Sequence, residues 1–217
     1  MLQPIMVRIF ICIINILLFS GMPALAQNDS LRRVWVGLDI LPFAKSIYGS
    51  KDNTVEIFGS YNIGKKRYAA AEGGFSSAKY QGSNFSYTSG GWFARAGIDF
   101  NVIRQEKFPG NDQILIGFRY GFSSMHYQAK NIQIPAGYWP AFLTEIRSVS
   151  FGSHWLETRA GIRAEVFPHL FIGWSVAGRL LLYSGHPVSM DPFVVPGFGN
   201  GTRKTNVGFS YFICLNF

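Results

Sequence analysis

The chain has 217 residues, of which 48% are hydrophobic and only 15% charged, and its formal net charge is +8. This composition excludes an intrinsically disordered chain, and the length suits a single domain. The positive charge does not indicate nucleic-acid binding, because no basic cluster with interleaved aromatic residues accompanies it. The 24 glycines and 20 phenylalanines favour a fold with many strands and turns.

The N-terminus has the pattern of a secretory signal peptide. Arg8 precedes an apolar run from Ile9 to Phe19, and Ala24-Leu25-Ala26 is a small-x-small cleavage site. The run is too short for a helix that spans a membrane, although an uncleaved anchor is the alternative. We therefore divide the chain into a signal peptide, residues 1–26, and one folded domain, residues 27–217. Cleavage would leave Cys214 as the only cysteine, so no internal disulfide is expected.

The folded domain alternates apolar and polar residues in segment after segment. A period of two indicates strands, and an apolar face over roughly 9–11 residues is typical of strands that cross a membrane. The last segment carries this pattern to the final residue, Phe217. The eight predicted strands are residues 34–41, 54–63, 68–78, 92–102, 113–123, 154–166, 170–183 and 206–217.

The connections between these strands alternate in length. Residues 64–67 and 167–169 are tight turns and 103–112 is somewhat longer, whereas 42–53, 79–91, 124–153 and 184–203 are long. Outer-membrane barrels have short periplasmic turns and longer extracellular loops. The sequence therefore predicts an eight-stranded antiparallel transmembrane up-and-down β-barrel in the bacterial outer membrane, with both termini in the periplasm.

Two partners follow from this interpretation. The apolar outer face would contact outer-membrane lipid. A C-terminal phenylalanine on the last strand, here Phe217, resembles the signal that the barrel-assembly machinery reads.

Charged residues occupy the face of the strands that would point inward. Eight strands enclose a space just wide enough for side chains, and buried charges must be paired. We expect a network of arginines and carboxylates that plugs the barrel; the alternative is a proton or ion path. The predicted members are Glu56, Glu72, Arg95, Asp99, Arg119, Glu157, Arg159, Arg163 and Glu165, with Arg179 as a further candidate.

Sequence signatures of catalysis are absent. There is no Walker loop, dinucleotide fingerprint, paired-cysteine metal site or H-E-x-x-H, so we predict no cofactor, no metal and no enzymatic activity. GFGNG, residues 197–201, is interpreted as a loop. The one weak catalytic candidate is His154, which Ser153 and Glu157 accompany, although strand geometry places Glu157 on the opposite face from His154.

The third long connection, residues 124–153, is the best candidate for contact with another envelope protein. It contains IPAGYWPAFL, and aromatic anchors of this kind favour partner binding. The candidate contact residues are Tyr138, Trp139 and Phe142. The alternative is a loop that packs on the barrel rim or enters the lumen.

Several stretches resemble a known family. They are ARAGIDFNVI (94–103), IGFRYGFS (116–123), GSHWLE (152–157), FIGWSV (171–176) and VPGFG (195–199). Together they resemble a Bacteroidota outer-membrane family known as domain of unknown function 6048, over residues 34–217. The resemblance implies a small outer-membrane barrel and supplies no activity or catalytic residue.

The sequence thus favours a filled barrel with a structural or binding role, or an accessory subunit of an outer-membrane complex. A lipid-modifying enzyme and, less favoured, a narrow pore are the alternatives.

Processing at the predicted site can be tested directly. Because the small-x-small signal ends at Ala26, the protein isolated from the envelope should begin at Gln27. N-terminal sequencing checks this, and a protein that still begins at Met1 would contradict it.

Overall fold

The structure is a computed structural model that describes residues 34–47, 52–83, 85–103, 111–134, 142–185 and 191–217. The predicted signal peptide lies outside these residues. The elements are β1 (Val34–Asp39), α2 (Leu41–Ile47), β2 (Asp52–Gly64), β3 (Arg67–Gln81), β4 (Ser86–Asn101), β5 (Gln113–Ile134), β6 (Phe142–Phe167), β7 (Leu170–Ser184), β8 (Val194–Val195), β9 (Gly199–Asn200) and β10 (Thr205–Asn216).

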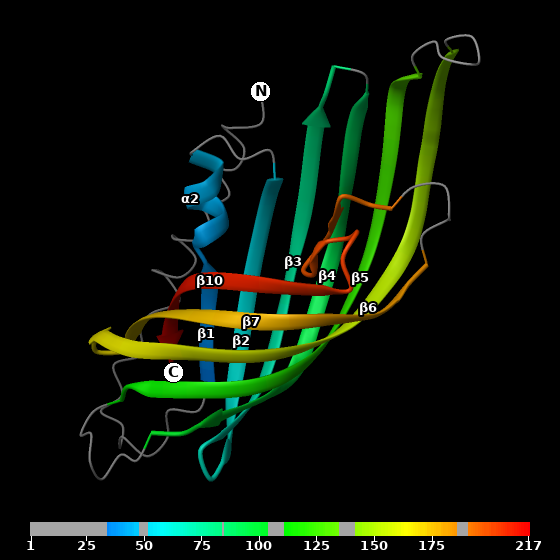
Figure 1. The fold of residues 1–217 in the computed structure, drawn as a ribbon. Coiled ribbons are helices and arrows are strands. Elements are labelled where there is room, and N and C mark those ends of the chain that lie inside the picture. The colour runs from blue at the N-terminus through cyan, green and yellow to red at the C-terminus, as the bar shows by residue number, and fades with distance from the viewer. Residues whose placement is uncertain (1–33, 48–51, 84, 104–110, 135–141, 186–190) are drawn as a thin grey trace. The chain divides into compact units, whose positions relative to one another are not determined.

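Eight antiparallel strands close into a barrel in the order β1-β10-β7-β6-β5-β4-β3-β2 (Figure 1). The first and last strands close the ring, with Trp35 opposite Asn216 and Asp39 opposite Phe212. At the end of this seam the backbone N–H of Val34 donates to the carbonyl of Phe217 at 3.2 Å, and that of Phe217 donates to Val34 at 2.9 Å. The apolar terminal strand is therefore a wall of the barrel.

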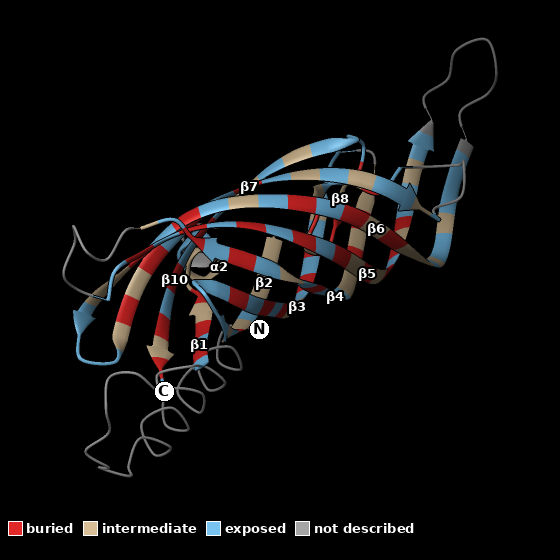
Figure 2. Cartoon of the chain, turned by 90° about the horizontal axis from the view of Figure 1, so that it is seen from below, coloured by how far each residue is buried: buried red, intermediate tan, exposed pale blue. Residues whose placement is uncertain are grey.

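Burial alternates along the strands, as Figure 2 shows by its bands of red and pale blue. On β4, for example, Phe93 and Arg95 are 2% exposed, whereas Trp92 on the other face is 43% exposed. Because successive side chains point to opposite faces, one face of each strand fills the lumen and the other forms the outer surface. Large apolar side chains cover that outer surface, which is the arrangement that a lipid environment stabilises.

One end of the barrel, here called the turn end, holds the tight turns, the start of β1 and the end of β10. The β2–β3 turn there has Lys65 and Lys66 at its centre with φ of 50° and 63°. Two positive φ values are typical of a type I′ turn, whose twist suits a two-residue hairpin. The opposite end is here called the loop end.

The predicted extent of two long loops is wrong, because the flanking strands continue into them. Strand β3 continues to Gln81 and β4 begins at Ser86, so residues 79–91 are mainly strand. Likewise β5 runs to Ile134 and β6 starts at Phe142, so most of residues 124–153 forms a long hairpin. The outward residues become polar in these extensions, so the sequence loses its membrane signature while the strand pairing continues.

The change of polarity coincides with a belt of aromatic rings on the outer surface. Trp92 contacts Phe122 with ring centroids 5.3 Å apart, and Phe122 contacts His154 at 4.9 Å. Tyr183 extends the belt to β7, 6.2 Å from His154. Belts of this kind lie at the membrane–water interface of outer-membrane barrels. On β5, the residues beyond the belt on this face include Gln128 and Lys130.

The two remaining connections contain structure of their own. Helix α2 follows β1, and Asp39 Oδ1 accepts a hydrogen bond from the N–H of Leu41 at 2.9 Å. Within the described ranges no helix is both long and apolar enough to cross a membrane. Strands β8 and β9 form a small hairpin in which Val195 pairs with Gly199.

The filled lumen predicts a sharp difference between two glycines. A Cβ at Gly121, which faces inward, would lie 2.1 Å from the Trp155 indole, whereas one at Gly59 on the outer face would lie 3.7 Å from its nearest neighbour. Gly121→Ala should therefore destabilise the barrel by about 1–3 kcal/mol through overpacking, and Gly59→Ala should change it little. Urea midpoints in detergent micelles measure this. Equal midpoints for the two variants would show that the lumen is loosely filled.

Candidate functional site

The lumen contains three layers of side chains. An apolar cluster fills the loop end, an ion cluster lies in the middle and a second apolar cluster fills the turn end. The loop-end plug consists of Tyr87, Phe93, Met125, Tyr127, Ala129, Trp155, Val195 and Phe198. The turn-end plug consists of Trp35, Tyr68, Leu115, Phe171, Phe212 and Cys214. The ion cluster consists of Glu56, Glu72, Arg95, Asp99, Arg119, Glu157, Arg159 and Arg179.

Arg95 stands at the centre of the ion cluster. Its side chain is fully buried and contacts three carboxylates. Its Nη1 donates to Glu157 Oε2 at 3.0 Å, its Nη2 lies 2.8 Å from Glu72 Oε2, and Nη2 also donates to Glu56. The planar guanidinium suits this role because its fixed fork of donors reaches several acceptors at once.

Glu72 is the corresponding centre of negative charge. Arg159 binds it with both terminal nitrogens, at 2.6 and 3.0 Å, and Arg119 Nε lies 3.1 Å from Oε1. Arg119 in turn donates two 2.8 Å hydrogen bonds to the two oxygens of Asp99. Glu72 therefore faces three guanidiniums, counting that of Arg95, which offsets the cost of burying its charge.

Glu157 completes the cluster on the side of β7. Arg179 Nε donates to Glu157 Oε2 at 2.7 Å, and Arg159 Nη2 lies 3.2 Å from Oε1. The members come from β2, β3, β4, β5, β6 and β7, and the pair of Arg159 and Glu72 joins β6 and β3 across the lumen. The cluster thus cross-links six of the eight strands of the barrel wall.

Two predicted members lie outside this cluster. Glu165 was expected in the interior network and instead lies beside the β6–β7 turn, where it accepts hydrogen bonds from Asn111 Nδ2 and from the His169 N–H. Glu165 keeps regular register opposite Phe171, but it lies near the end of β6 at the turn end, away from the ion cluster in the middle of the lumen. Arg163 is buried but is hydrogen-bonded to Gln113 and Ser60, both uncharged.

The structure also adds residues that the sequence reasoning missed. Val195 and Phe198, from the region interpreted as a loop, are 1% and 0% exposed within the loop-end plug. The hairpin β8–β9 therefore packs into the barrel interior, and Arg179 Nη1 donates to the Phe198 carbonyl at 3.2 Å. The apolar VVPGF run is the only sequence signal for this burial.

A cavity of about 360 Å³ lies at the loop end between α2, β2, β10 and the β8–β9 hairpin. Its lining includes Glu56 and Arg179, which belong to the ion cluster, and Phe93 of the loop-end plug. The cavity therefore reaches the ion cluster, where ion-paired side chains form its floor.

The structure does not bring together the three residues of the weak catalytic candidate, His154, Ser153 and Glu157. His154 lies in the aromatic belt, and its Nδ1 is 2.6 Å from the Tyr120 hydroxyl. Ser153 is fully buried on the other face, where its hydroxyl is 3.0 Å from that of Ser184, and Glu157 is held in the ion cluster. Among the described residues no group of three His, Cys, Asp or Glu side chains could hold a metal.

The predicted contact residues can be placed only in part. Tyr138 and Trp139 lie outside the described residues, and Phe142 is the first residue of β6. Phe217 is 50% exposed at the end of the β1–β10 seam.

The closed ring, the filled lumen and the apolar outer surface define a small β-barrel of the outer-membrane type. Residues 5–216 match the family described as Domain of unknown function (DUF6048), and the chain belongs to that family. A search of curated proteins found no match.

Three solved structures of outer-membrane or surface proteins are similar to this chain. A major outer membrane protein from Thermus thermophilus matches with a TM-score of 0.52 and 8% identity, over 85% of this chain and 97% of that one. Neisserial surface protein A matches at 0.43 and 12%, over 85% and 95%. Ail, the attachment invasion locus protein of Yersinia pestis, matches at 0.44 and 10%, over 85% and 97%. At such low identity the likeness to the Thermus protein concerns the fold alone.

The ion cluster predicts a large effect for its central cation. Arg95→Met keeps most of the side-chain length but leaves three carboxylates without their shared partner, which should cost about 3–5 kcal/mol. The matched control is Arg147→Met, because the Arg147 side chain is 92% exposed. Urea unfolding in micelles compares them, and similar midpoints for both variants would show that the cluster does not stabilise the barrel.

Proposed function

We propose that this protein is a closed outer-membrane barrel that serves as a binding or scaffold subunit in the envelope. Both termini are in the periplasm, and the loop end faces the outside of the cell. The observation that carries the proposal is the sheet that continues past the aromatic belt at the loop end. Residues from β3, β4, β5 and β6 form this sheet, here called the extension (Figure 1).

The length of the strands supports this proposal. Strands β5 and β6 have 22 and 26 residues, whereas a membrane crossing needs about 9–11. At about 3.3 Å per residue, the surplus amounts to tens of ångströms of sheet beyond the membrane. Long ordered strands are not needed to anchor or close the barrel, so a contact role in the aqueous phase accounts for them.

The two faces of the extension differ. Tyr127 and Ala129 are fully buried on the inner face, and Ile132, Ile146 and Val149 pack against that core. The side chains of Glu145 and Arg147 are 57% and 92% exposed. The extension is therefore a folded sheet with its own apolar side covered and a polar side free for contact.

One edge of the extension also has no partner strand among the described residues. Strand β6 pairs with β7 only from Ser153 onward, since β7 ends at Ser184. The described residues of β6 before Gly152, whose carbonyl accepts from the N–H of Gly185 at 3.0 Å, thus have β5 as their strand partner. An open strand edge presents backbone N–H and C=O groups in register, which a partner strand can complete.

Two assembly features belong to the same proposal. The apolar outer face contacts outer-membrane lipid. Phe217, half exposed at the seam that closes the ring, is the signal for the barrel-assembly machinery.

Removing the β5–β6 part of the extension tests the binding role. In the variant, residues 127–149 are replaced by a two-residue Asn-Gly turn, because His126 is opposite Ser150 in the hairpin register. The membrane barrel should still form, and co-purification from mild detergent should lose the partner found with the native protein. The measurement is mass spectrometry of proteins that co-purify with each form.

The control is a substitution on the loop-end surface outside the extension, Lys45→Ala on α2, which should leave the partners unchanged. An identical set of partners with and without residues 127–149 would contradict a binding role for the extension.

A further inference from the structure

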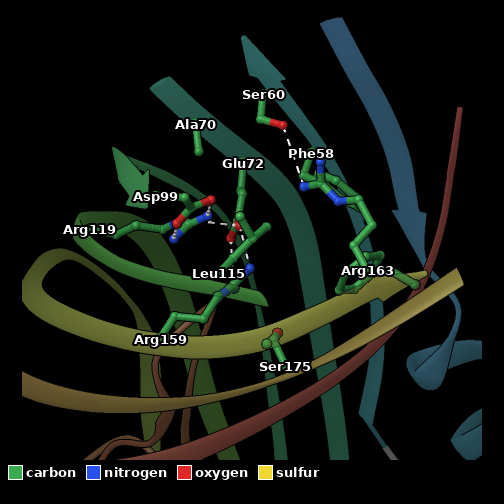
Figure 3. A pocket seen from close by; sticks show the side chains of 12 residues that line it. Phe58, Ser60, Ala70, Glu72, Asp99, Leu115, Arg119, Arg159, Arg163 and Ser175 are labelled. Atoms are coloured by element: carbon green, nitrogen blue, oxygen red, sulfur yellow. Dashed lines mark hydrogen bonds and ion pairs between the residues drawn. The ribbon is translucent and has the colours of Figure 1, made fainter. Parts of the chain in front are cut away.

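A second, much smaller cavity lies inside the barrel between the ion cluster and the turn-end plug. Its volume is about 30 Å³. The polar and charged side chains that line it are Ser60, Glu72, Asp99, Arg119, Arg159, Arg163 and Ser175 (Figure 3). One ordered water needs about 10–15 Å³ by this measure, so the cavity has room for about two waters or one halide ion.

Arg163 is the unusual member of the lining. It is 3% exposed, yet its only hydrogen bonds among the described residues are to Gln113 Oε1 at 3.3 Å and Ser60 Oγ at 3.5 Å. Its guanidinium also lies 5.4 Å from the centre of the Trp35 ring. In the described part of the chain no carboxylate lies within ion-pair distance of it, in contrast to the five carboxylate ion pairs that Arg95 and Arg159 make.

The charges around the cavity leave this cation uncompensated. The ion cluster contains four carboxylates and four arginines, and Arg163 is a fifth arginine beside it. Arginine does not lose its proton in proteins, so a buried guanidinium must be neutralised by a partner. The remaining buried carboxylate of the described residues, Asp39, accepts hydrogen bonds from the N–H groups of Leu41 and Tyr211.

Hydrogen-bond donors without a partner among the described residues also lie at this cavity. Ser175 Oγ and Arg163 Nε are both buried and have no hydrogen-bond partner among the described residues, although Ser175 lines the cavity. Ser60 Oγ accepts from Arg163, so its own O–H proton remains free to donate. Two hydroxyls and a guanidinium are donors that suit an anion.

We propose that this cavity binds one small monovalent inorganic anion of halide size, with chloride as the ordinary occupant. Arg163, Ser175 and Ser60 hold it. The carboxylates Glu72 and Asp99 also line the cavity, but each is bound by both terminal nitrogens of an arginine, Arg159 or Arg119. The anion therefore lies on the Arg163 side, away from them.

Bromide can report the site in the intact barrel. The protein is refolded and crystallised in sodium bromide, and anomalous scattering is measured at the bromine edge. The expected result is a bromide peak inside the barrel in contact with Arg163 and Ser175. A cavity that holds only water, with no anomalous peak, would overturn the proposal.

A solution measurement tests the same site independently. The native protein is refolded in sodium chloride or in sodium gluconate at equal ionic strength, and urea unfolding is compared. A tenfold excess of chloride over its Kd would lower the unfolding equilibrium constant about 11-fold. An equal midpoint in the two salts would overturn the proposal.

Variants separate this effect from general salt effects. Arg163→Gln should lose the chloride dependence, whereas Arg147→Gln, at an exposed site, should retain it. If Arg163→Gln does not fold, Ser175→Ala serves instead and should weaken the dependence. Full chloride dependence in a folded Arg163→Gln or Ser175→Ala barrel would place the effect elsewhere and overturn the proposal.

Discussion

The burial of guanidinium groups in a lumen only wide enough for side chains is the constraint on which the rest of the structure depends. A charge that leaves water must be matched by opposite charge and by hydrogen bonds, or its desolvation destabilises the fold. Here Arg95 and Glu72 each contact three opposite charges, and the contacts cross the lumen as well as neighbouring strands. The ion cluster therefore ties strands together from the inside, while backbone hydrogen bonds tie them along the wall.

The two apolar plugs make this arrangement possible. Trp155 and Phe198 lie in the plug on the loop-end side of the ion cluster, beside the cavity that reaches Glu56 and Arg179, and Phe171 and Phe212 lie in the plug on the other side. Excluding water strengthens each ion pair but also raises the cost of any charge without a partner. Glycine is needed where large side chains meet: at Gly117 a Cβ would lie 1.9 Å from Asp99 Oδ1. The packing of the lumen and its ion pairs therefore depend on each other.

Alternation alone predicted much of the barrel. It identified the eight strands and the inward facing of residues such as Glu72 and Arg159, because a strand places every second residue on the same face. It could not show which charges meet across the lumen. It also could not show that Glu165, which is in regular register opposite Phe171 near the end of β6, lies beside a turn and away from the ion cluster.

The extension was missed for a different reason. Lipid-facing apolar residues were the signal for a strand, and that signal ends at the aromatic belt of Trp92, Phe122 and His154. Beyond it the pairing continues with polar residues such as Gln128 outside and Tyr127 inside, which resembles a loop in sequence. The inward folding of Val195 and Phe198 was missed because a connection between strands usually lies on the surface. The sequence thus predicts the part of the fold that lipid constrains better than the part that water surrounds.

We propose that the charged lumen is a closed scaffold and not an ion path. Single-channel recording of the purified, folded protein in planar bilayers tests this most directly. Because both plugs and the ion cluster occupy the lumen, we expect no discrete openings across a range of voltages and salt concentrations. Steady and reproducible conductance steps from the native protein would contradict it and would make the ion cluster part of a conduction path.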